Sequence, residues 1–290
     1  MTWKKVFVWT VFVGVTLFSS ARMLSDPHFW ENLFGDQVSR TDIEKALRFS
    51  GEESLWPNSI SLENGRPVDI HYTLNEDWQR YIKKIFRRHK PDYGAFVALD
   101  PNTGRVLSLV GYHRSSGNFL NRYALKADYP AASVFKVVTA TAVLDKEIAE
   151  PDTIIPFNGK GHTLYKKNVY NNSHNTWTRT PSLKKAFARS YNTVFGKLGL
   201  NYVGAQNLKI YAHKFAFNAG LNSDIPFETG VSKINNDDRW SIVEAASGFT
   251  QANTLSPVHG ALIASAAANG GVMMTPYFVD SLYDRENSEF

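Results

Sequence analysis

The strongest constraint on the fold of this chain is the apolar stretch at residues 129–140, in which Ser133 and Lys136 are the conspicuous polar residues. A helix that is apolar nearly all round is buried in the core of a protein. The two polar residues are three positions apart, so they share one face of that helix. Ala132 and Ala140 stand four positions from Lys136, so no acid on the same helix neutralises the lysine.

This serine and lysine pair predicts an activated nucleophile. A buried lysine without an acidic partner has a lowered pKa and accepts the proton of a nearby serine hydroxyl. Ser133 also lies in the first turn of the predicted helix, where free backbone N–H groups stabilise a developing oxyanion. We therefore predict that Ser133 is a nucleophile and that Lys136 is its general base.

The S-x-x-K pattern alone is weak evidence, because a chain of this composition contains about one copy by chance. A second copy is present from Ser182 to Lys185. It begins a predicted surface helix with Thr180 as the N-cap and Pro181 at the first helical position. Lys185 has another lysine beside it, whereas Lys136 has apolar neighbours. We therefore interpret Ser182 as structural.

The segment Ser190-Tyr191-Asn192 follows that helix and places a serine and an amide at one loop corner. The same S-x-N pattern occurs at residues 116–118 and 173–175, in polar stretches that we interpret as loops. Ser190 and Asn192 are therefore the second pair of candidate site residues.

Other segments indicate a compact domain that begins near Pro67. Alternating residues at 68–74 predict a strand, and residues 76–89 predict an amphipathic helix. Two apolar runs, at 94–99 and 105–110, flank a turn rich in Pro, Asn and Gly and predict a β-hairpin.

The net charge of +5 does not indicate nucleic-acid binding, because no basic run is interleaved with base-stacking aromatic residues. The predicted helix at residues 76–89 has a basic face. We interpret this face as solvated, and contact with anionic lipid or cell-wall polymer is the alternative. Its residues are Arg80, Lys83, Lys84, Arg87 and Arg88.

The N-terminus has the cationic flank and apolar core of an export signal, because Lys4 and Lys5 precede an uncharged stretch at residues 6–21. The positive end stays in the cytoplasm. We predict an uncleaved anchor, since no A-x-A site ends the stretch. A signal peptide cleaved near residues 19–21 is the alternative, because the stretch is shorter than the roughly 20 residues that span a bilayer.

These segments predict three parts: a signal anchor at residues 1–21, a membrane-proximal linker at 22–66, and one domain at 67–290. A capping box at residues 41–44 predicts a short helix within the linker. The domain is expected outside the cytoplasmic membrane of a bacterium, attached by a single membrane span.

Together these segments resemble the penicillin-binding protein transpeptidase domain, a serine acyltransferase fold shared with class A and class D β-lactamases. The resemblance covers roughly residues 67–283 and implies an α/β (α+β) fold, with an antiparallel sheet and a helical subdomain. It depends on the order of these segments: the hairpin at 94–112, Ser133-Val134-Phe135-Lys136, the phrase from Ser182 through Ser190-Tyr191-Asn192 to Phe195, Ala246-Ser247-Gly248-Phe249-Thr250-Gln251, Leu255-Ser256-Pro257, a small-residue helix at 258–268 stopped by Asn269-Gly270-Gly271, and the segment at 276–280.

The resemblance also implies roles for the candidate residues. Ser133 is the nucleophile and Lys136 the general base, Asn192 orients the lysine and holds the substrate amide, and Ser190 passes a proton to the leaving amine. The implied substrates are peptidoglycan stem peptides that end in D-Ala-D-Ala, and β-lactams acylate the same serine. No metal or cofactor is implied.

Three other interpretations stay open. A class D β-lactamase or a β-lactam sensor domain has a similar size, but Asn192 argues against it because the second motif of these proteins ends in an aliphatic residue. A class A β-lactamase shares the asparagine, but the chain shows no match to its deacylating glutamate loop. A non-catalytic cell-wall module with the same fold is the third.

The third motif of the family, K-T-G or K-S-G, does not occur in the chain. In the family this motif lies on an inner strand that binds the substrate carboxylate. The sequence alone therefore predicts a domain that is incomplete at its C-terminus, with negligible transpeptidase activity for residues 1–290.

Overall fold

The structure is a computed structural model that describes residues 56–61, 65, 67–115, 117, 119–284 and 288–289. The predicted anchor at residues 1–21 and the predicted linker helix near residues 41–44 lie outside the described residues. Within the described ranges, no helix has the length and apolar character needed to cross a membrane.

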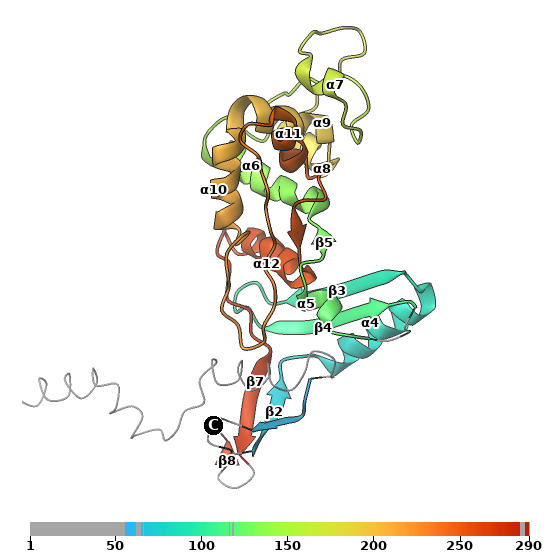
Figure 1. Ribbon diagram of the computed structural model, residues 1–290, viewed down its shortest axis with the longest axis vertical. Helices are drawn as coiled ribbons and strands as arrows, with labels where there is room; N and C mark the ends of the chain where they lie inside the picture. Colours follow the sequence, from blue (N-terminus) through green and yellow to red (C-terminus); the bar gives the residue numbers. More distant parts are fainter. Residues whose placement is uncertain are drawn as a thin grey trace, which may run out of the picture.

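A four-stranded antiparallel sheet brings together segments from both ends of the described chain, at the bottom of Figure 1. Val68 pairs with Asp284, and Ile60, Ile70 and Leu282 are buried with Val68 in its apolar core. The predicted strand at 68–74 is confirmed, although it runs one residue earlier at its start and ends two residues earlier. The strands in spatial order are β1 (Ser59–Ser61), β2 (Pro67–Tyr72), β7 (Val279–Asp284) and β8 (Ser288–Glu289).

The predicted hairpin is confirmed as the antiparallel pair β3 (Tyr93–Leu99) and β4 (Val106–His113). Its turn closes through the N–H of Gly104, which donates to the carbonyl of Asp100 at 2.9 Å. Gly104 has a φ of +80°, and the Cβ of any other residue there would lie 2.2 Å from the carbonyl oxygen of Thr275. The turn therefore requires glycine.

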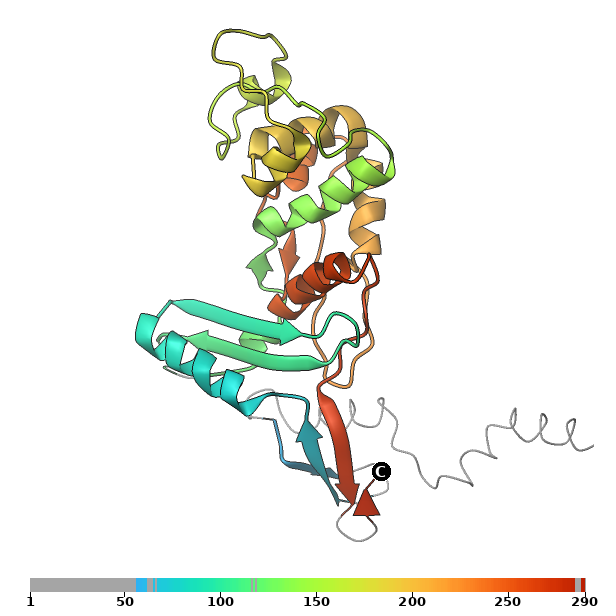
Figure 2. The same ribbon diagram turned by 180° about the vertical axis from the view of Figure 1, so that it is seen from behind.

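The predicted amphipathic helix is also confirmed, as α4 (Glu76–His89), which lies along the hairpin (Figure 2). The amide of Gln79 fixes it to β4: Oε1 accepts from Leu109 N at 2.9 Å and from Ser108 Oγ at 2.6 Å, and Nε2 donates to Leu109 O at 3.0 Å. The apolar face of α4 is only partly covered in the described structure, since Trp78 and Tyr81 are 47% and 64% exposed.

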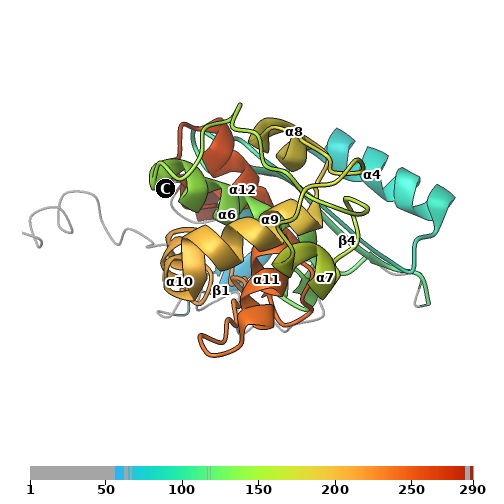
Figure 3. The same cartoon turned by 90° about the horizontal axis from the view of Figure 1, so that it is seen from above.

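Most of the remaining helices form the upper part of the molecule in Figure 1, whereas α5 (Arg122–Leu125) contacts β3 and β4 of the hairpin. Among them, α6, α9, α10 and α11 pack against one another (Figure 3). The predicted small-residue helix is confirmed as α12, whose N-cap is Ser256. A π-helical turn, η2 (Gly199–Val203), joins α9 to α10. The helices are α5 (Arg122–Leu125), α6 (Phe135–Asp145), α7 (Lys166–Tyr170), α8 (Leu183–Ala188), α9 (Asn192–Leu198), α10 (Gly204–Lys214), α11 (Arg239–Ser247) and α12 (Pro257–Ala268).

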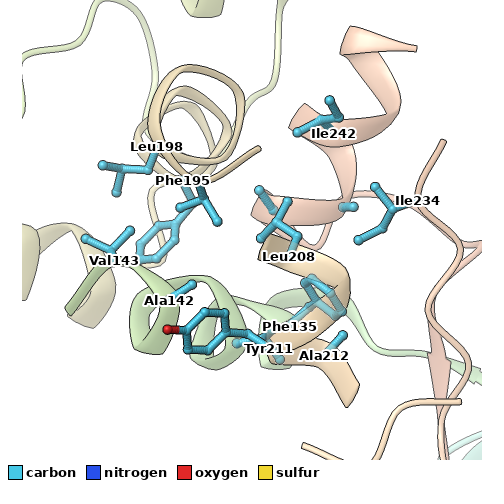
Figure 4. Close-up of a cluster of buried hydrophobic side chains, with 14 of the residues drawn as sticks. Phe135, Ala142, Val143, Phe195, Leu198, Leu208, Tyr211, Ala212, Ile234 and Ile242 are labelled. Atoms are coloured by element: carbon cyan, nitrogen blue, oxygen red, sulfur yellow. The ribbon is translucent and has the colours of Figure 1, made fainter. Parts of the chain in front are cut away.

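The main core fills the space between these helices. Phe135 of α6, Phe195 of α9 and Leu208 of α10 are fully buried and point toward one another (Figure 4). Burying an apolar side chain of this size contributes roughly 1.5–3 kcal/mol to folding. This core fixes the position of α6 relative to α9 and α11, the three helices that carry Lys136, Asn192 and Ser247.

The predicted continuous helix at residues 129–140 is wrong at its start. Tyr129 and Pro130 form a short strand, β5, which pairs with β6 (Thr254–Leu255), and a 3₁₀ turn, η1 (Ala132–Val134), then leads into α6. Proline restricts the residue before it to extended conformations, so the helix does not begin before the proline. The N–H of Ala131 donates to the carbonyl of Asn253 at 2.7 Å, which holds the segment to β6.

The predicted N-terminus of the helix that contains Ser182 is also corrected. Helix α8 begins at Leu183, and its N-cap is Ser182 rather than Thr180. Backbone bridges pair Phe157 with Arg179 and Ile154 with Ser182, so the residues before Leu183 are extended. The hydroxyl of Ser182 accepts from Lys185 N at 3.3 Å. Its interpretation as a structural residue is therefore confirmed.

Candidate active site

Ser133 lies on the 3₁₀ turn that precedes α6, at the surface of the helical part of the molecule. The preceding residue, Ala132, has a φ of +45°, a left-handed conformation that a side-chain-bearing residue adopts only when its surroundings impose it. The N–H of Val134 donates to the carbonyl of Ala131 at 3.1 Å and closes the turn. The hydroxyl of Ser133 is exposed, and Lys136 lies beneath it in the core.

Lys136 is only 2% exposed, and its side-chain nitrogen contacts three oxygen atoms. Its Nζ lies 2.9 Å from Ser133 Oγ, 2.7 Å from Asn192 Oδ1 and 2.6 Å from the carbonyl oxygen of Ser247. Burial lowers the pKa of Lys136 to about 8, because a buried site disfavours the charged form. Within the described part of the chain, no carboxylate pairs with this lysine.

Ser190 follows the end of α8 and has a φ of +53°. Its N–H donates to the carbonyl of Phe187 at 2.9 Å, which ends the helix in a tight turn. This turn brings its hydroxyl within 2.9 Å of the Ser133 hydroxyl, to which it donates. The two serine hydroxyls are therefore joined by a direct hydrogen bond.

Asn192 is the first residue of α9, and its position is fixed on three sides. Its backbone N–H donates to Gly161 O at 2.7 Å, and its Nδ2 donates to His162 O at 2.8 Å. Its Oδ1 accepts from Lys136. A primary amide has two N–H donors, so one donor of Asn192 remains for a ligand.

Ser247 and Gly248 belong to the site, although sequence reasoning gave them no role. Ser247 ends α11 and offers its carbonyl to Lys136, and Gly248 caps the helix with a φ of +66°. A Cβ at Gly248 would lie 1.9 Å from the Ala132 carbonyl oxygen and 3.1 Å from Ser133 N. A glycine after an apolar helix indicates a C-cap, but no sequence signal showed that this cap lies against the nucleophile.

The structure thus brings all four predicted residues, Ser133, Lys136, Ser190 and Asn192, into one hydrogen-bonded group. Ser182 does not join them. The other S-x-N segment within the described residues, at 173–175, is an exposed loop, as predicted. Residues 116 and 118 of the third copy lie outside the described residues.

This arrangement of a serine, a buried lysine and an S-x-N corner agrees with a family comparison of the sequence. The model described as "Penicillin binding protein transpeptidase domain" matches residues 94–289. The chain belongs to the penicillin-binding protein transpeptidase family. The resemblance inferred from the motifs is therefore confirmed.

Among curated members of the penicillin-binding protein family, the peptidoglycan D,D-transpeptidase PbpA of Mycobacterium tuberculosis is 30% identical to the chain over 223 residues. The match covers 66% of this chain and 44% of PbpA. The chain therefore spans less than half the length of that relative.

Solved penicillin-binding proteins have the same fold. The crystal structure of PBPA from M. tuberculosis superimposes with a TM-score of 0.63 at 25% identity, covering 77% of this chain and 56% of that chain. The penicillin G acyl-enzyme of the same protein gives a TM-score of 0.60 at 26% identity, covering 77% and 57%. The predicted mixed α/β class with a helical subdomain is confirmed.

Proposed function

We propose that the chain carries the acylation centre of a peptidoglycan D,D-transpeptidase, with Ser133 as its nucleophile. One observation carries this proposal: the buried Lys136 Nζ lies 2.9 Å from Ser133 Oγ and has no carboxylate partner in the described structure. A structural lysine at such a depth normally pairs with an acid. A lysine that contacts a surface serine instead is suited to take a proton from it.

The three contacts of Lys136 suit a neutral amine. A neutral amine has two N–H donors and one lone pair. The Asn192 amide oxygen and the Ser247 carbonyl accept the two donors, and the lone pair is then directed at the hydroxyl of Ser133. Because the pKa of Lys136 is about 8, a small fraction of this lysine is already neutral at neutral pH and can accept a proton.

In the proposed reaction, Lys136 removes the proton of Ser133 while Oγ attacks the carbonyl carbon of the D-Ala-D-Ala peptide bond. The C–N bond then breaks, and the proton passes from Lys136 through the Ser190 hydroxyl to the leaving D-Ala amine. The free N–H of Asn192 holds the substrate amide. An amine of a neighbouring stem, or water, attacks the acyl-enzyme ester and releases Ser133.

The same site is proposed to react with β-lactams. Support comes from PBPA of M. tuberculosis, which has been solved as a penicillin G acyl-enzyme. Asn192 at the end of the S-x-N corner, and its contact with Lys136, argue for this function over that of a class D β-lactamase or a sensor domain.

The active-site assignment is tested with matched serine variants. Intact-mass spectrometry after long incubation with penicillin is expected to show one adduct on the parent chain and on Ser182→Ala, and none on Ser133→Ala. An adduct on the Ser133→Ala protein would overturn the assignment. Rapid loss of the adduct would instead indicate a β-lactamase, and no adduct on any protein would indicate a non-catalytic module.

Acylation by the 290-residue chain is proposed to be slow, because the chain contains no K-T-G or K-S-G motif. Loss of a single oxyanion-hole donor typically lowers the rate by about 10²–10³. Stopped-flow measurement of penicillin acylation tests this point. A second-order rate constant equal to that of PbpA from M. tuberculosis, measured in parallel, would contradict it.

The proposed substrate lies outside the cytoplasmic membrane, so we propose that residues 67–290 act on that side, with residues 1–21 as the anchor and 22–66 as a linker whose last part, β1, already pairs with β2 of the domain. A reporter fused after residue 66 is expected to be active outside the membrane and to stay membrane-bound after a high-salt wash. Release by salt, or a mature N-terminus near residue 22, would support a cleaved signal peptide.

A further inference from the structure

The positive charge of the chain is concentrated on one side of the candidate site. Residues 153–223 contain ten lysines and arginines and no aspartate or glutamate, whereas the whole chain has a net charge of only +5. The remaining residues are therefore net negative. The acid-free stretch includes α7, α8, α9 and α10 and carries both Ser190 and Asn192. The loop around α7 projects at the top of Figure 1.

Three of the ten cations have hydrogen-bonding or ionic partners within the protein, and a fourth, Lys166, lies 5.5 Å from the centroid of the Trp240 ring. Lys197 is buried and donates to Asn171 O and Asn172 Oδ1, each at 3.0 Å. Lys209 donates to Asn236 Oδ1 at 2.8 Å, and Lys214 forms an ion pair with Asp145 at 3.6 Å.

The other seven cations, Lys166 included, are exposed and form no ion pair with an acid in the described part of the chain. The two acids that flank the acid-free stretch do not pair with these cations. Asp152, just before it, is exposed and forms no ion pair with them, and Asp224, just after it, is buried and accepts from the N–H groups of Phe278 and Val279. Six of the seven lie on the first half of the loop and on α8 with its C-cap. We call them the cationic rim: Lys160, Lys166, Lys167, Lys184, Lys185 and Arg189.

Two rim residues, Lys160 and Arg189, are sequence neighbours of residues that form hydrogen bonds within the site. Lys160 immediately precedes Gly161 and His162, whose carbonyl oxygens accept from Asn192 at 2.7 and 2.8 Å. A Cβ at Gly161 would lie 2.2 Å from the Tyr191 ring, so this loop packs directly on the S-x-N corner. On the other side, Arg189 immediately precedes Ser190, whose hydroxyl lies 2.9 Å from that of Ser133.

We propose that the cationic rim binds the carboxylates of a peptide substrate, in addition to the carboxylate of its terminal D-Ala. This inference rests on the proposed function, because it assigns the rim to the substrate of Ser133. Unpaired cations around a site raise the local concentration of an anionic ligand and its association rate. Five of the six rim residues are lysines, which act as mobile point charges and suit separated carboxylates better than one tightly held phosphate.

The test measures peptide binding by fluorescence anisotropy, with a labelled oligoglutamate that ends in D-Ala-D-Ala. The double variant Lys160→Gln/Arg189→Gln removes two rim charges. Lys84→Gln/Arg88→Gln removes two exposed charges from α4, far from the rim, and is the matched control. At about 25 mM salt we expect the rim variant to bind roughly fivefold more weakly, and the difference to shrink at about 150 mM salt.

Each alternative outcome overturns the inference. Equal weakening in the control would mean that only net charge matters. Equal affinity for the oligoglutamine counterpart would exclude carboxylate recognition, and stronger competition by polyphosphate than by unlabelled oligoglutamate would assign the rim to a phosphate polymer. A separate measurement of the penicillin adduct on Ser133 distinguishes the two proposals. If binding depends on the rim but no adduct forms, only the proposed function is refuted. If an adduct forms but binding does not depend on the rim, only the proposed role of the rim is refuted.

Discussion

The burial of Lys136 makes the stability of this protein depend on pH between about pH 8 and pH 10.5. The perturbation is a change of pH, applied in parallel to the parent chain and to Lys136→Gln. Glutamine keeps hydrogen-bond donors for Asn192 Oδ1 and the Ser247 carbonyl but does not titrate. The difference between the two proteins therefore isolates the contribution of the lysine.

The folded-state pKa of about 8 lies below the value of 10.5 that an exposed lysine has in the unfolded chain. Between these values the unfolded state binds more protons than the folded state, so the free energy of unfolding rises with pH across the window. The shift corresponds to roughly 3 kcal/mol, of which about 2.5 kcal/mol is recovered between about pH 7 and pH 10. The Lys136→Gln protein lacks this rise.

Denaturant unfolding at the two pH values gives the free energies, and NMR of lysine ¹³Cε groups gives the pKa directly. We expect one lysine signal that titrates near 8 in the parent chain and is absent from the variant. A signal assigned to Lys136 that titrates above about 10, or equal pH dependence in the two proteins, would refute the argument that burial without an acid sets its pKa.

Gly248→Ala is expected to lower the free energy of unfolding by at least about 2 kcal/mol, because the new Cβ would overlap the Ala132 carbonyl. Gly270 has a similar φ of +61° but no atom within 4 Å of a Cβ, so Gly270→Ala is expected to lower the free energy of unfolding by only about 1 kcal/mol. Equal losses in denaturant unfolding would mean that backbone strain alone is responsible. Lys197→Met removes the two hydrogen bonds from this lysine to residues 171 and 172. Amide hydrogen exchange of residues 158–178 is therefore expected to become faster, while that of α6 stays unchanged. Equal acceleration in both segments would show that Lys197 does not act only on the loop. His259 is buried, accepts from Gly230 N at 2.8 Å and contacts Phe215 O at 2.6 Å, and burial lowers its pKa below 6.5. The free energy of unfolding is therefore expected to fall as the pH drops below 6.5, and to fall less in His259→Gln. Identical pH profiles of the two proteins would show that this histidine does not contribute.

Elements with a strong, regular pattern could be predicted from the sequence. The helix α4 and the hairpin β3–β4 follow from apolar residues at helical spacing and from a turn that requires Gly104. The segment at residues 129–140 was assigned in part incorrectly, because an apolar run does not reveal where a helix begins. Its start depends on the pairing of Tyr129 with Leu255, which is distant in sequence.

Only those parts of the site that act through side chains could be predicted from the sequence. Ser133 and Lys136 could be paired from their spacing on one helix, whereas Ser190 and Asn192 were joined to them through a family resemblance and not through a physical argument. The Ser247 carbonyl could not be predicted, because every residue has a carbonyl and only the packing of α11 against α6 selects this one. The sequence also could not show that the cationic rim forms no ion pairs, because this depends on which acidic side chains lie close to it in the folded protein.

The pairing of β2 with β7 has a consequence for how the chain folds during synthesis. Val68 and Asp284 are neighbours in the sheet, although almost the whole described chain lies between them. At about 5–20 residues per second, a ribosome needs roughly 10–40 s to make β7 after β2 has been made. The helices around Phe135, by contrast, assemble from segments much closer together in the chain. Strand β2 therefore stays without β7 while the helical core around Phe135 forms, and its exposed edge is a part of the nascent protein that needs protection from misassociation.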